Sequence, residues 1–438
     1  MHDKNLRQQP GEVQRPPDDP STTLGAALDN GWSSISRNAW KVTLLSLGGW
    51  ALVSVDTALW AVNYPLIAEE FDISDNMIGV IYAFIYAAGA LATFAAGPLM
   101  DRIGRKPVYQ LCLFAAILGS VLTAGAPGII ILIIARCVTQ AGAQAEWMAG
   151  QVLVAEEAPA RFRGRLIGLA QIGYPLGFFF AGLLSFAIVP LLGWRWVFAC
   201  GVLPIIMMLW ARRAIKESAH FTEMTAKTTK EERGRIRDLF APGLRRTTIL
   251  ITVWSLFQTL AFGGLASYMP TIFERFGVSL DKLYLANIIA TGVAGFGYFA
   301  CASVGEWIGR REAAAIWLIL GAAGGVFMAT EGRTFVTLTI GYSLFYFFGV
   351  AHISAAIGFV AESFPTRLRG SGTNFATAAQ MIGFMFAGLT GPMLLNSVGV
   401  VASMWIWLVV FQLIAAFALL GMKRIRPGTE LADVEMPG

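Results

Sequence analysis

The sequence predicts an all-α membrane protein with twelve transmembrane helices in two six-helix, pseudo-symmetric bundles. Of its 438 residues, 56% are hydrophobic and only 14% are charged, whereas an average soluble protein has roughly 25% charged residues. The apolar residues recur in blocks of about 20, the length that crosses about 30 Å of hydrocarbon as a helix. These blocks lack the alternation of barrel strands, so we expect helices, in which backbone polar groups bond within their own span.

Charged residues, glycines and prolines divide the apolar blocks into twelve candidate spans. They are residues 41–65, 77–100, 107–125, 128–153, 165–188, 194–211, 247–271, 283–305, 312–330, 334–358, 371–394 and 400–422. Of the 33 Lys and Arg, 28 lie in the termini and in the loops that follow spans two, four, six, eight and ten. By the positive-inside rule both termini are cytoplasmic, which requires an even number of spans.

The segments outside the spans are assigned from their composition. Residues 1–23 combine four prolines with charges and lack an apolar core, so we expect a disordered cytoplasmic tail. Residues 24–40 are expected to form an interfacial helix that leads into the first span. The charged residues 212–246 are expected to be a cytoplasmic loop between an N-terminal bundle, 41–211, and a C-terminal bundle, 247–422, with 423–438 as a second cytoplasmic tail.

The chain repeats itself at half its length. Residues 155–164 (AEEAPARFRG) recur as residues 361–370 (AESFPTRLRG), with six of ten positions identical. A second pair, residues 101–106 (DRIGRK) and 306–311 (EWIGRR), follows spans two and eight. Two similar six-helix halves related by an axis along the membrane normal form a transporter architecture, in which the substrate site lies between the halves near the midplane.

These motifs resemble those of the major facilitator superfamily. Residues 97–106 (GPLMDRIGRK) are similar to its signature between helices 2 and 3, and residues 193–198 (GWRWVF) to its usual start of helix 6. The repeated Glu-x-x-Pro-x-Arg-x-Arg-Gly segments are similar to those of the sugar-porter and organic-ion branch. Within that branch, residues 145–147 (AEW) and 153–156 (LVAE) most resemble the bacterial metabolite:proton symporters for carboxylates and aromatic acids. The resemblance covers about residues 24–425.

The resemblance implies a secondary transporter with a small-molecule substrate and protons as its partners. We expect a monomer in the lipid bilayer of a bacterial inner membrane, without a cofactor, a metal or a nucleic-acid partner. The four cysteines lie in apolar spans without the paired spacing of metal ligands, so we expect neither a disulfide nor a zinc site. No cluster of nucleophile, base and orienting group supports an enzyme.

The resemblance also implies a cytoplasmic gate made of opposite charges that bridge helices when the site faces outward. Its candidate residues are Asp101, Arg105, Glu156, Arg163, Glu306, Glu362 and Arg369. Asp101 is also expected to meet the positive N-terminal end of helix 11. Trp307 stands where the first copy has Arg102, so we expect a weaker network in the C-terminal half. The alternative for the flanking cations is that they only fix the topology.

Only three charged residues, Asp56, Arg136 and Glu146, lie in the interior of the spans, together with His352. Inserting Asp or Arg at a helix centre costs roughly 2.5 to 3.5 kcal/mol, so each should face a partner or a wet cavity. Asp56 and Arg136 lie about 14 and 12 Å from the outer ends of their helices. We therefore expect an ion pair between them near the midplane, with a purely structural pair as the alternative.

Such a pair can couple a proton to an anion. Ionised Asp56 holds Arg136, and a proton from outside that neutralises Asp56 releases Arg136 to bind an anionic group of the substrate. Glu146 and His352 occupy equivalent positions in the two halves, near the cytoplasmic end of the cavity. They are candidates for proton exit or inner gating, because a histidine can change charge near neutral pH. A role in helix packing is the alternative for both.

Further polar residues in the spans suggest a specificity pocket. Gln140 and Trp147 share the face of Arg136 on helix 4. The other candidates are Gln171, Tyr174, Gln258, Tyr268, Asn287, Tyr298, Tyr342, Tyr346, Asn374 and Gln380. Rings with a few amides and one arginine fit a small aromatic or aliphatic carboxylate. Taken individually, most residues of this kind are more often packing residues or aromatic residues of the interfacial belt.

Other functions stay open to different degrees. The chain has no phosphate loop ending in Gly-Lys-Ser/Thr, which excludes an ATP-driven pump. Residues 173–177 (GYPLG) depart from the Gly-Pro pair of the drug:proton antiporters, which disfavours export. A sugar or polyol porter, a transporter of neutral or cationic metabolites or drugs, and a non-transporting sensor on a transporter scaffold remain as alternatives.

Overall fold

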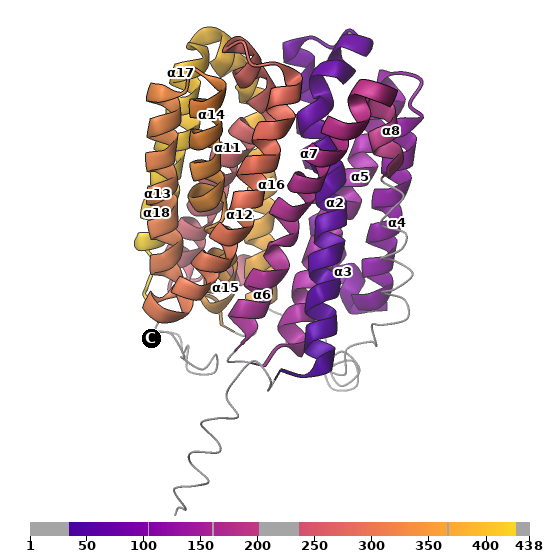
Figure 1. Cartoon of the computed structure of the whole chain (residues 1–438). Helices are drawn as coiled ribbons and strands as arrows, with labels where there is room; N and C mark the ends of the chain where they lie inside the picture. Colours follow the sequence, from indigo (N-terminus) through magenta and orange to yellow (C-terminus); the bar gives the residue numbers. More distant parts are fainter. Residues whose placement is uncertain (1–34, 104, 160–161, 201–235, 366–367, 426–438) are drawn as a thin grey trace, which may run out of the picture.

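The computed structural model describes residues 35–103, 105–159, 162–200, 236–365 and 368–425 (Figure 1). Across these ranges the chain forms helices and no strand. Eleven of the described helices are long and apolar enough to cross a membrane. The prediction of an all-α membrane protein is therefore confirmed. The predicted tail 1–23, most of the predicted interfacial helix and most of the central loop lie outside the described residues.

The N-terminal half begins with four long helices. They are α2 (Arg37–Glu70), α3 (Asp75–Ile103), α4 (Arg105–Ala124) and α5 (Ile129–Glu157). The fifth span consists of α6 (Arg163–Gln171) and α7 (Gly173–Leu192), and α8 (Trp194–Ala199) starts the sixth. The rest of the sixth predicted span, residues 201–211, lies outside the described part.

The C-terminal half follows a short 3-10 helix, η4 (Ile236–Phe240). Its first three spans are α11 (Arg245–Arg275), α12 (Leu280–Ile308) and α13 (Arg310–Glu331). The tenth span is interrupted, with α14 (Phe335–Leu344), a π-helical segment η5 (Phe345–Val350) and α15 (Ile353–Glu362). The last two are α16 (Arg369–Ser397) and the series α17 (Gly399–Met404), π-helical η6 (Trp405–Phe411) and α18 (Gln412–Leu420).

Local chemistry sets several helix ends. Ser36 caps α2, because its hydroxyl accepts a hydrogen bond from the amide of Ala39 at 3.0 Å. As a result α2 starts at Arg37, inside the segment predicted as a separate interfacial helix. At the other end of the bundle, Gly193 between α7 and α8 has φ of 84°, a left-handed conformation that glycine adopts without a Cβ clash.

The two halves stand side by side, with α2 to α8 on one side and α11 to α18 on the other (Figure 1). Between them, α3 packs against α16 and α7 packs against α12. Glycines permit the close approach. A Cβ on Gly79 of α3 would lie 2.8 Å from the carbonyl of Gly388 in α16, and a Cβ on Gly168 of α6 would lie 2.8 Å from the Ala302 side chain in α12. The halves are thus in contact on both sides of the centre.

Candidate functional site

A cavity of about 110 Å³ lies between the halves. Its lining comes from α2, α3, α5, α6 and α7 on one side and from α11, α12, the tenth span and α16 on the other. Eight of the predicted pocket residues line it, namely Arg136, Gln140, Trp147, Gln171, Tyr174, Gln258, Tyr298 and Gln380. The structure therefore brings most of the predicted polar set to one central place.

Five other predicted pocket residues do not line this cavity. They are Tyr268, Asn287, Tyr342, Tyr346 and Asn374. Asn287 instead joins helices, because its amide donates to the carbonyl of Phe178 at 2.8 Å and its oxygen accepts from the hydroxyl of Tyr342 at 3.3 Å. Tyr268 donates to the carbonyl of Gly388 on α16. These bonds join α12 to α7 and α14, and α11 to α16.

Sequence reasoning missed most of the aromatic lining. The cavity also contacts Trp50, Trp60, Tyr82, Tyr86, Phe178, Phe262 and Phe384, together with Gln144. Gln144 follows Gln140 by one turn of α5, so the same helical spacing that selected Gln140 could have found it. The aromatic residues carried no such signal, because rings are common wherever helices pack in a membrane protein.

The structure joins Asp56 of α2 to Arg136 of α5. The Nη1 atom of Arg136 donates to Oδ2 of Asp56 at 2.5 Å, and the side chains are only 1% (Arg136) and 6% (Asp56) exposed. The guanidinium also lies 5.3 Å from the ring centre of Trp60 and 5.4 Å from that of Phe198. Oδ1 of Asp56 and Nε of Arg136 have no partner among the described residues. The pair is thus held by one charged bond and two ring contacts.

Glu146 lies elsewhere, in a fully buried position between helices of the N-terminal half. Its carboxyl group faces the Tyr109 hydroxyl of α4 at the point where Gly49 leaves room in α2. That hydroxyl donates to the carbonyl of Leu45 at 3.2 Å. None of the salt bridges in the described part of the chain includes Glu146, and the residue does not line the central cavity.

His352 is held by two partners at the junction of η5 and α15. The indole Nε1 of Trp254 donates to Nε2 of His352 at 3.3 Å, so the proton of a neutral ring sits on Nδ1. Nδ1 lies 2.6 Å from the carbonyl of Gly349 and donates to it. His352 is buried and does not line the cavity. Although Glu146 and His352 are equivalent in the repeat, their surroundings differ.

On the side of the bundle where α2 begins, Arg310 collects two of the predicted gate acids. It pairs with Glu306 at 3.0 Å and with Glu362, and so ties α13 to α12 and α15. Gly164 at the start of α6 abuts this cluster, since a Cβ there would lie 2.8 Å from Oε1 of Glu306. Arg310 was not predicted, although it is the repeat equivalent of Arg105.

The remaining gate candidates are not covered by the structure. The side chains of Asp101, Arg105, Glu156, Arg163 and Arg369 lie outside the described part. The expectation that the N-terminal network is the stronger one therefore stays a prediction.

On the opposite side, a polar contact joins the halves. The hydroxyl of Tyr284 on α12 donates to Oδ1 of Asn63 on α2 at 2.5 Å, and the amide nitrogen of Asn63 donates to Ser185 of α7 at 2.8 Å. Asn63 is fully buried. It lies seven residues beyond Asp56, which is about 10 Å along α2. This Asn63 contact joins the halves along the seam on this side of the bundle, which we call the outer seam because the sequence predicts that it faces away from the cytoplasm.

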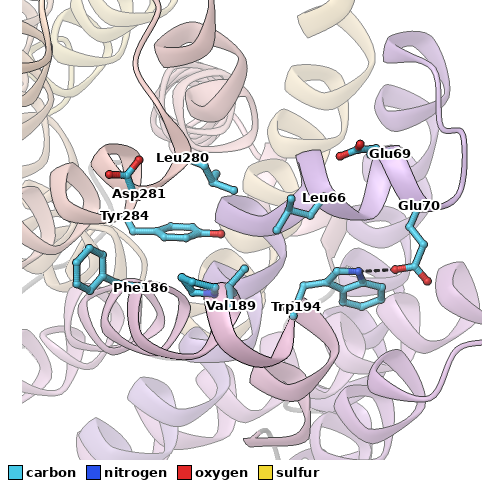
Figure 2. A pocket seen from close by; sticks show the side chains of 11 residues that line it. Leu66, Glu69, Glu70, Phe186, Val189, Trp194, Leu280, Asp281 and Tyr284 are labelled. Atoms are coloured by element: carbon cyan, nitrogen blue, oxygen red, sulfur yellow. Dashed lines mark hydrogen bonds between the residues drawn. The ribbon is translucent and has the colours of Figure 1, made fainter.

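A second cavity, of about 890 Å³, lies at this outer seam (Figure 2). Leu66, Phe186, Val189, Trp194 and Tyr284 form its apolar walls, and Glu69, Glu70 and Asp281 supply carboxylates. Glu70 is engaged, because it accepts from the indole of Trp194 at 2.7 Å and pairs with Arg195 at 2.5 Å. Tyr284 belongs both to this wall and to the Asn63 contact, which therefore lies between the outer cavity and the centre.

Comparison with known proteins adds three findings. The model of the Major Facilitator Superfamily matches residues 44–352. A candidate niacin/nicotinamide transporter, NiaP, of Bacillus subtilis (strain 168) is 26% identical over 352 residues, covering 80% of this chain and 86% of that protein. The arabinose-proton symporter of the same organism is 23% identical over 432 residues, covering 89% and 92%.

A solved structure has the same fold. It is the major facilitator superfamily proton:xylose symporter XylE bound to 6-bromo-6-deoxy-D-glucose, with a TM-score of 0.70 and 18% sequence identity. The match covers 89% of this chain and 97% of that chain.

Proposed function

The chain belongs to the Major Facilitator Superfamily, and on this premise we propose that it moves a small organic anion together with protons across the membrane. The substrate is an aromatic or aliphatic carboxylate, and transport follows alternating access. Asp56 is the proton-linked acid and Arg136 binds the anion. The observation that carries this proposal is their buried ion pair, with Arg136 on the wall of the central cavity.

Charge balance supplies the physical reason for coupling. The empty pair is neutral, with one carboxylate and one guanidinium. A proton on Asp56 and an anion on Arg136 together keep the site neutral, whereas either one alone leaves a net charge in a buried place. A buried charge without a partner costs about 3–5 kcal/mol. The protein therefore changes between its outward-facing and inward-facing conformations either with the pair empty or with both the proton and the anion bound.

The geometry of the pair suits this exchange. Arg136 holds Asp56 through a single bond from Nη1, and its Nε has no partner among the described residues. The ring faces of Trp60 and Phe198 keep the guanidinium in place when Asp56 is neutral. An incoming carboxylate then meets a fixed cation that can donate two parallel hydrogen bonds.

One relative supports a carboxylate as the substrate, and another supports coupling to protons. Niacin, named for one relative, is an aromatic carboxylate, and the arabinose relative is named a proton symporter. The aromatic lining of the cavity suits a flat ring, with Tyr86 stacked on Phe384 at 4.9 Å and Phe262 at 5.8 Å from the same ring. Such rings bury large apolar area and fix orientation.

The proposed mechanism also assigns roles to residues outside the central cavity. Glu146 is our candidate for proton exit, since it is a buried acid of the N-terminal half without a salt-bridge partner among the described residues. The two bonds of His352 favour a packing role for it. Arg310 with Glu306 and Glu362 would form the C-terminal part of a cytoplasmic gate. We also propose that the protein is a monomer of a bacterial inner membrane with both termini in the cytoplasm.

A sugar or polyol porter is the second candidate. Five glutamines line the cavity, namely Gln140, Gln144, Gln171, Gln258 and Gln380, and amides bond sugar hydroxyls well because they both donate and accept. The relative named an arabinose-proton symporter also supports a sugar as the substrate. Arg136 argues for the carboxylate, because a neutral sugar does not balance a proton taken up by Asp56.

Transport by Asp56→Asn in proteoliposomes tests the proposal. The variant should exchange internal for external carboxylate but lose accumulation driven by a pH gradient, because the amide cannot take up the proton. Asp281→Asn, at an exposed acid of the outer cavity, is the matched control and should accumulate normally. Wild-type accumulation by Asp56→Asn would refute the assignment of the proton site. Binding of sugars but of no carboxylate would favour the second candidate.

A further inference from the structure

A groove of about 640 Å³ runs along the surface of the C-terminal half, between α12 and α14. These two helices pack against each other (Figure 1). The walls of the groove come from Ile289 and Val293 of α12 and from the tenth span between Phe335 and Phe348. None of its lining residues lines the central cavity.

The groove opens toward the hydrocarbon of the membrane. Four of its apolar side chains are 38–59% exposed although they belong to membrane spans, namely Ile289, Val293, Val336 and Ile340. The two hydroxyl groups of the lining are occupied, because Thr339 donates to the carbonyl of Phe335 and Ser343 donates to that of Thr339, each at 2.7 Å. The wall thus has no free hydroxyl group, and an apolar chain suits it.

The depth of the groove matches one leaflet of a bilayer. Val293 follows Lys282, in the first turn of α12, by eleven residues, or about 16 Å of helix. Half of a hydrocarbon core of about 30 Å is about 15 Å. One turn beyond Val293, α12 meets the tenth span so closely that a Cβ on Gly297 would overlap the carbonyl oxygen of Phe347. The groove therefore begins at the end of the bundle that carries the outer seam and closes near the membrane centre.

Two cations lie at the outer end of the groove. Lys282 shares the face of α12 that carries Ile289 and Val293, because residues seven and eleven positions apart lie on one side of a helix. Arg333 precedes α14 by two residues. Its guanidinium lies 5.4 Å from the ring centre of Phe276, in the connection that leads from α11 into α12. Both Lys282 and Arg333 are exposed.

Cations are rare at this end of the bundle. The sequence places four there, namely Arg195, Arg275, Lys282 and Arg333. Arg195 pairs with Glu70, and Arg275 donates to the side chain of Asn396. No salt bridge in the described part of the chain includes Lys282 or Arg333. Since the positive-inside rule keeps cations away from this side, two of them at the mouth of one apolar groove indicate an anionic partner.

We propose that the groove binds one acyl chain of an outer-leaflet phospholipid, whose phosphate lies between Lys282 and Arg333. The lipid is an anionic one such as phosphatidylglycerol, whose only charge is its phosphate, because Lys282 would repel an additional ammonium group. The neighbouring acid Asp281 lines the outer cavity instead. The bilayer is as apolar as the groove, so the chain gains packing there but no hydrophobic free energy. Selectivity therefore comes from the two cations, each of which changes binding about fivefold.

Photo-crosslinking in vesicles tests this site. The full-length protein is reconstituted in phosphatidylcholine with a small fraction of phosphatidylglycerol that carries a diazirine at the end of one acyl chain. We expect label on residues 343–348, at the inner end of the groove, when the peptides are mapped by mass spectrometry. Excess unlabelled phosphatidylglycerol should displace this label, and phosphatidylethanolamine with the same chains should displace it about fivefold less well.

Variants then assign the label to the groove. Val293→Trp fills the space from α12 and should lower the labelling of residues 343–348 about tenfold. Leu285→Trp is the matched control, because Leu285 is 40% exposed on the same helix, against 38% for Val293, but lies outside the groove. Lys282→Gln leaves the packing intact and should lower the labelling about fivefold. Lys423→Gln, at an exposed cation of the cytoplasmic end, should leave it unchanged.

Three results would refute the lipid site. Equal labelling of Val293→Trp and the wild type, or equal displacement by the two lipids, would mean that only unselected boundary lipid lies there. Unchanged labelling of Lys282→Gln would remove the role of the phosphate. A wild-type dimer on gel filtration that Val293→Trp dissociates would show that a second copy of the chain covers the groove. None of these results bears on the proposed transport function, which depends on the ion pair between α2 and α5.

Discussion

The stability of the Asp56–Arg136 pair gives a direct measure of its role. Arg136→Gln leaves the Asp56 carboxylate, 6% exposed, without its cation. Water cannot replace the lost bond there, and breaking a buried pair from one side costs about 3–5 kcal/mol. Asp56→Asn should cost less, because Arg136 keeps its contacts with Trp60 and Phe198 and the new amide oxygen still accepts a hydrogen bond. The double variant removes both charges, so it should cost less than the sum of the single variants.

Thermal unfolding of the purified variants in one detergent measures these differences. An unfolding entropy of about 2.1 cal/mol/K per residue gives about 0.9 kcal/mol per degree for a chain of this length. Arg136→Gln should therefore lower Tm by about 3–5 °C. The Tm loss of the double variant should be smaller than the summed losses of the two single variants, by about half of the Arg136→Gln loss. Lys282→Gln, at an exposed position in the first turn of α12, serves as the control and should stay within about 1 °C of the wild type.

Additive effects would contradict this reasoning. The Tm losses can be converted to losses in the free energy of unfolding. If the losses of the two single variants sum to that of the double variant within about 0.5 kcal/mol, the two side chains do not interact in the folded protein. The exchange of partners at Arg136 would then have no physical basis. A coupling of several kcal/mol, by contrast, is the energy that a proton and an anion must jointly replace.

Two further predictions concern the contacts that close the bundle. Asn63→Ala removes the bonds to Ser185 and Tyr284, each worth about 1 kcal/mol, and should open the outer seam. Labelling from outside of a cysteine placed at the cavity residue Thr57 should rise about tenfold over the same cysteine in the wild-type background, and unchanged labelling would contradict this. Gly142→Val would push a side chain into the backbone of α4, whose nearest atoms lie 2.6 Å from a Cβ. It should abolish monodisperse yield on gel filtration, whereas Gly128→Ala, with open space around it, should not.

The sequence was most informative where helix geometry alone decides. The rise of a helix is fixed, so counting residues from the outer ends put Asp56 and Arg136 at one depth, and the structure joins them. The rotation of each helix about its axis depends on its neighbours, which a sequence does not contain. For that reason Gln140 and Trp147, which were selected from Arg136 on one helix, line the same cavity as Arg136. Tyr268 and Asn287, on other helices, lie in helix contacts outside that cavity.

The tenth span shows a second limit of sequence-based periodicity. The π-helical segment Phe345–Val350 breaks the regular spacing of 3.6 residues per turn. Tyr342 before the segment and His352 after it are therefore not related by the rotation that a regular α-helix would give them. Such a segment leaves no distinct trace in composition, so the repeat alone suggested that His352 matches Glu146.

Equivalence in the repeat is therefore equivalence of position and not of chemistry. Glu146 lies in the N-terminal half against Tyr109 without a salt bridge in the described part, whereas His352 has both ring nitrogens engaged by Trp254 and Gly349. A group whose two polar atoms are satisfied in its neutral form has little reason to take a proton, because charging it would break the bond from Trp254. The buried ion pair between Asp56 and Arg136 likewise joins two helices of the N-terminal half, α2 and α5. In the proposed mechanism, proton movement therefore belongs to the N-terminal half, while the C-terminal half contributes Arg310 and the opposing wall of the cavity.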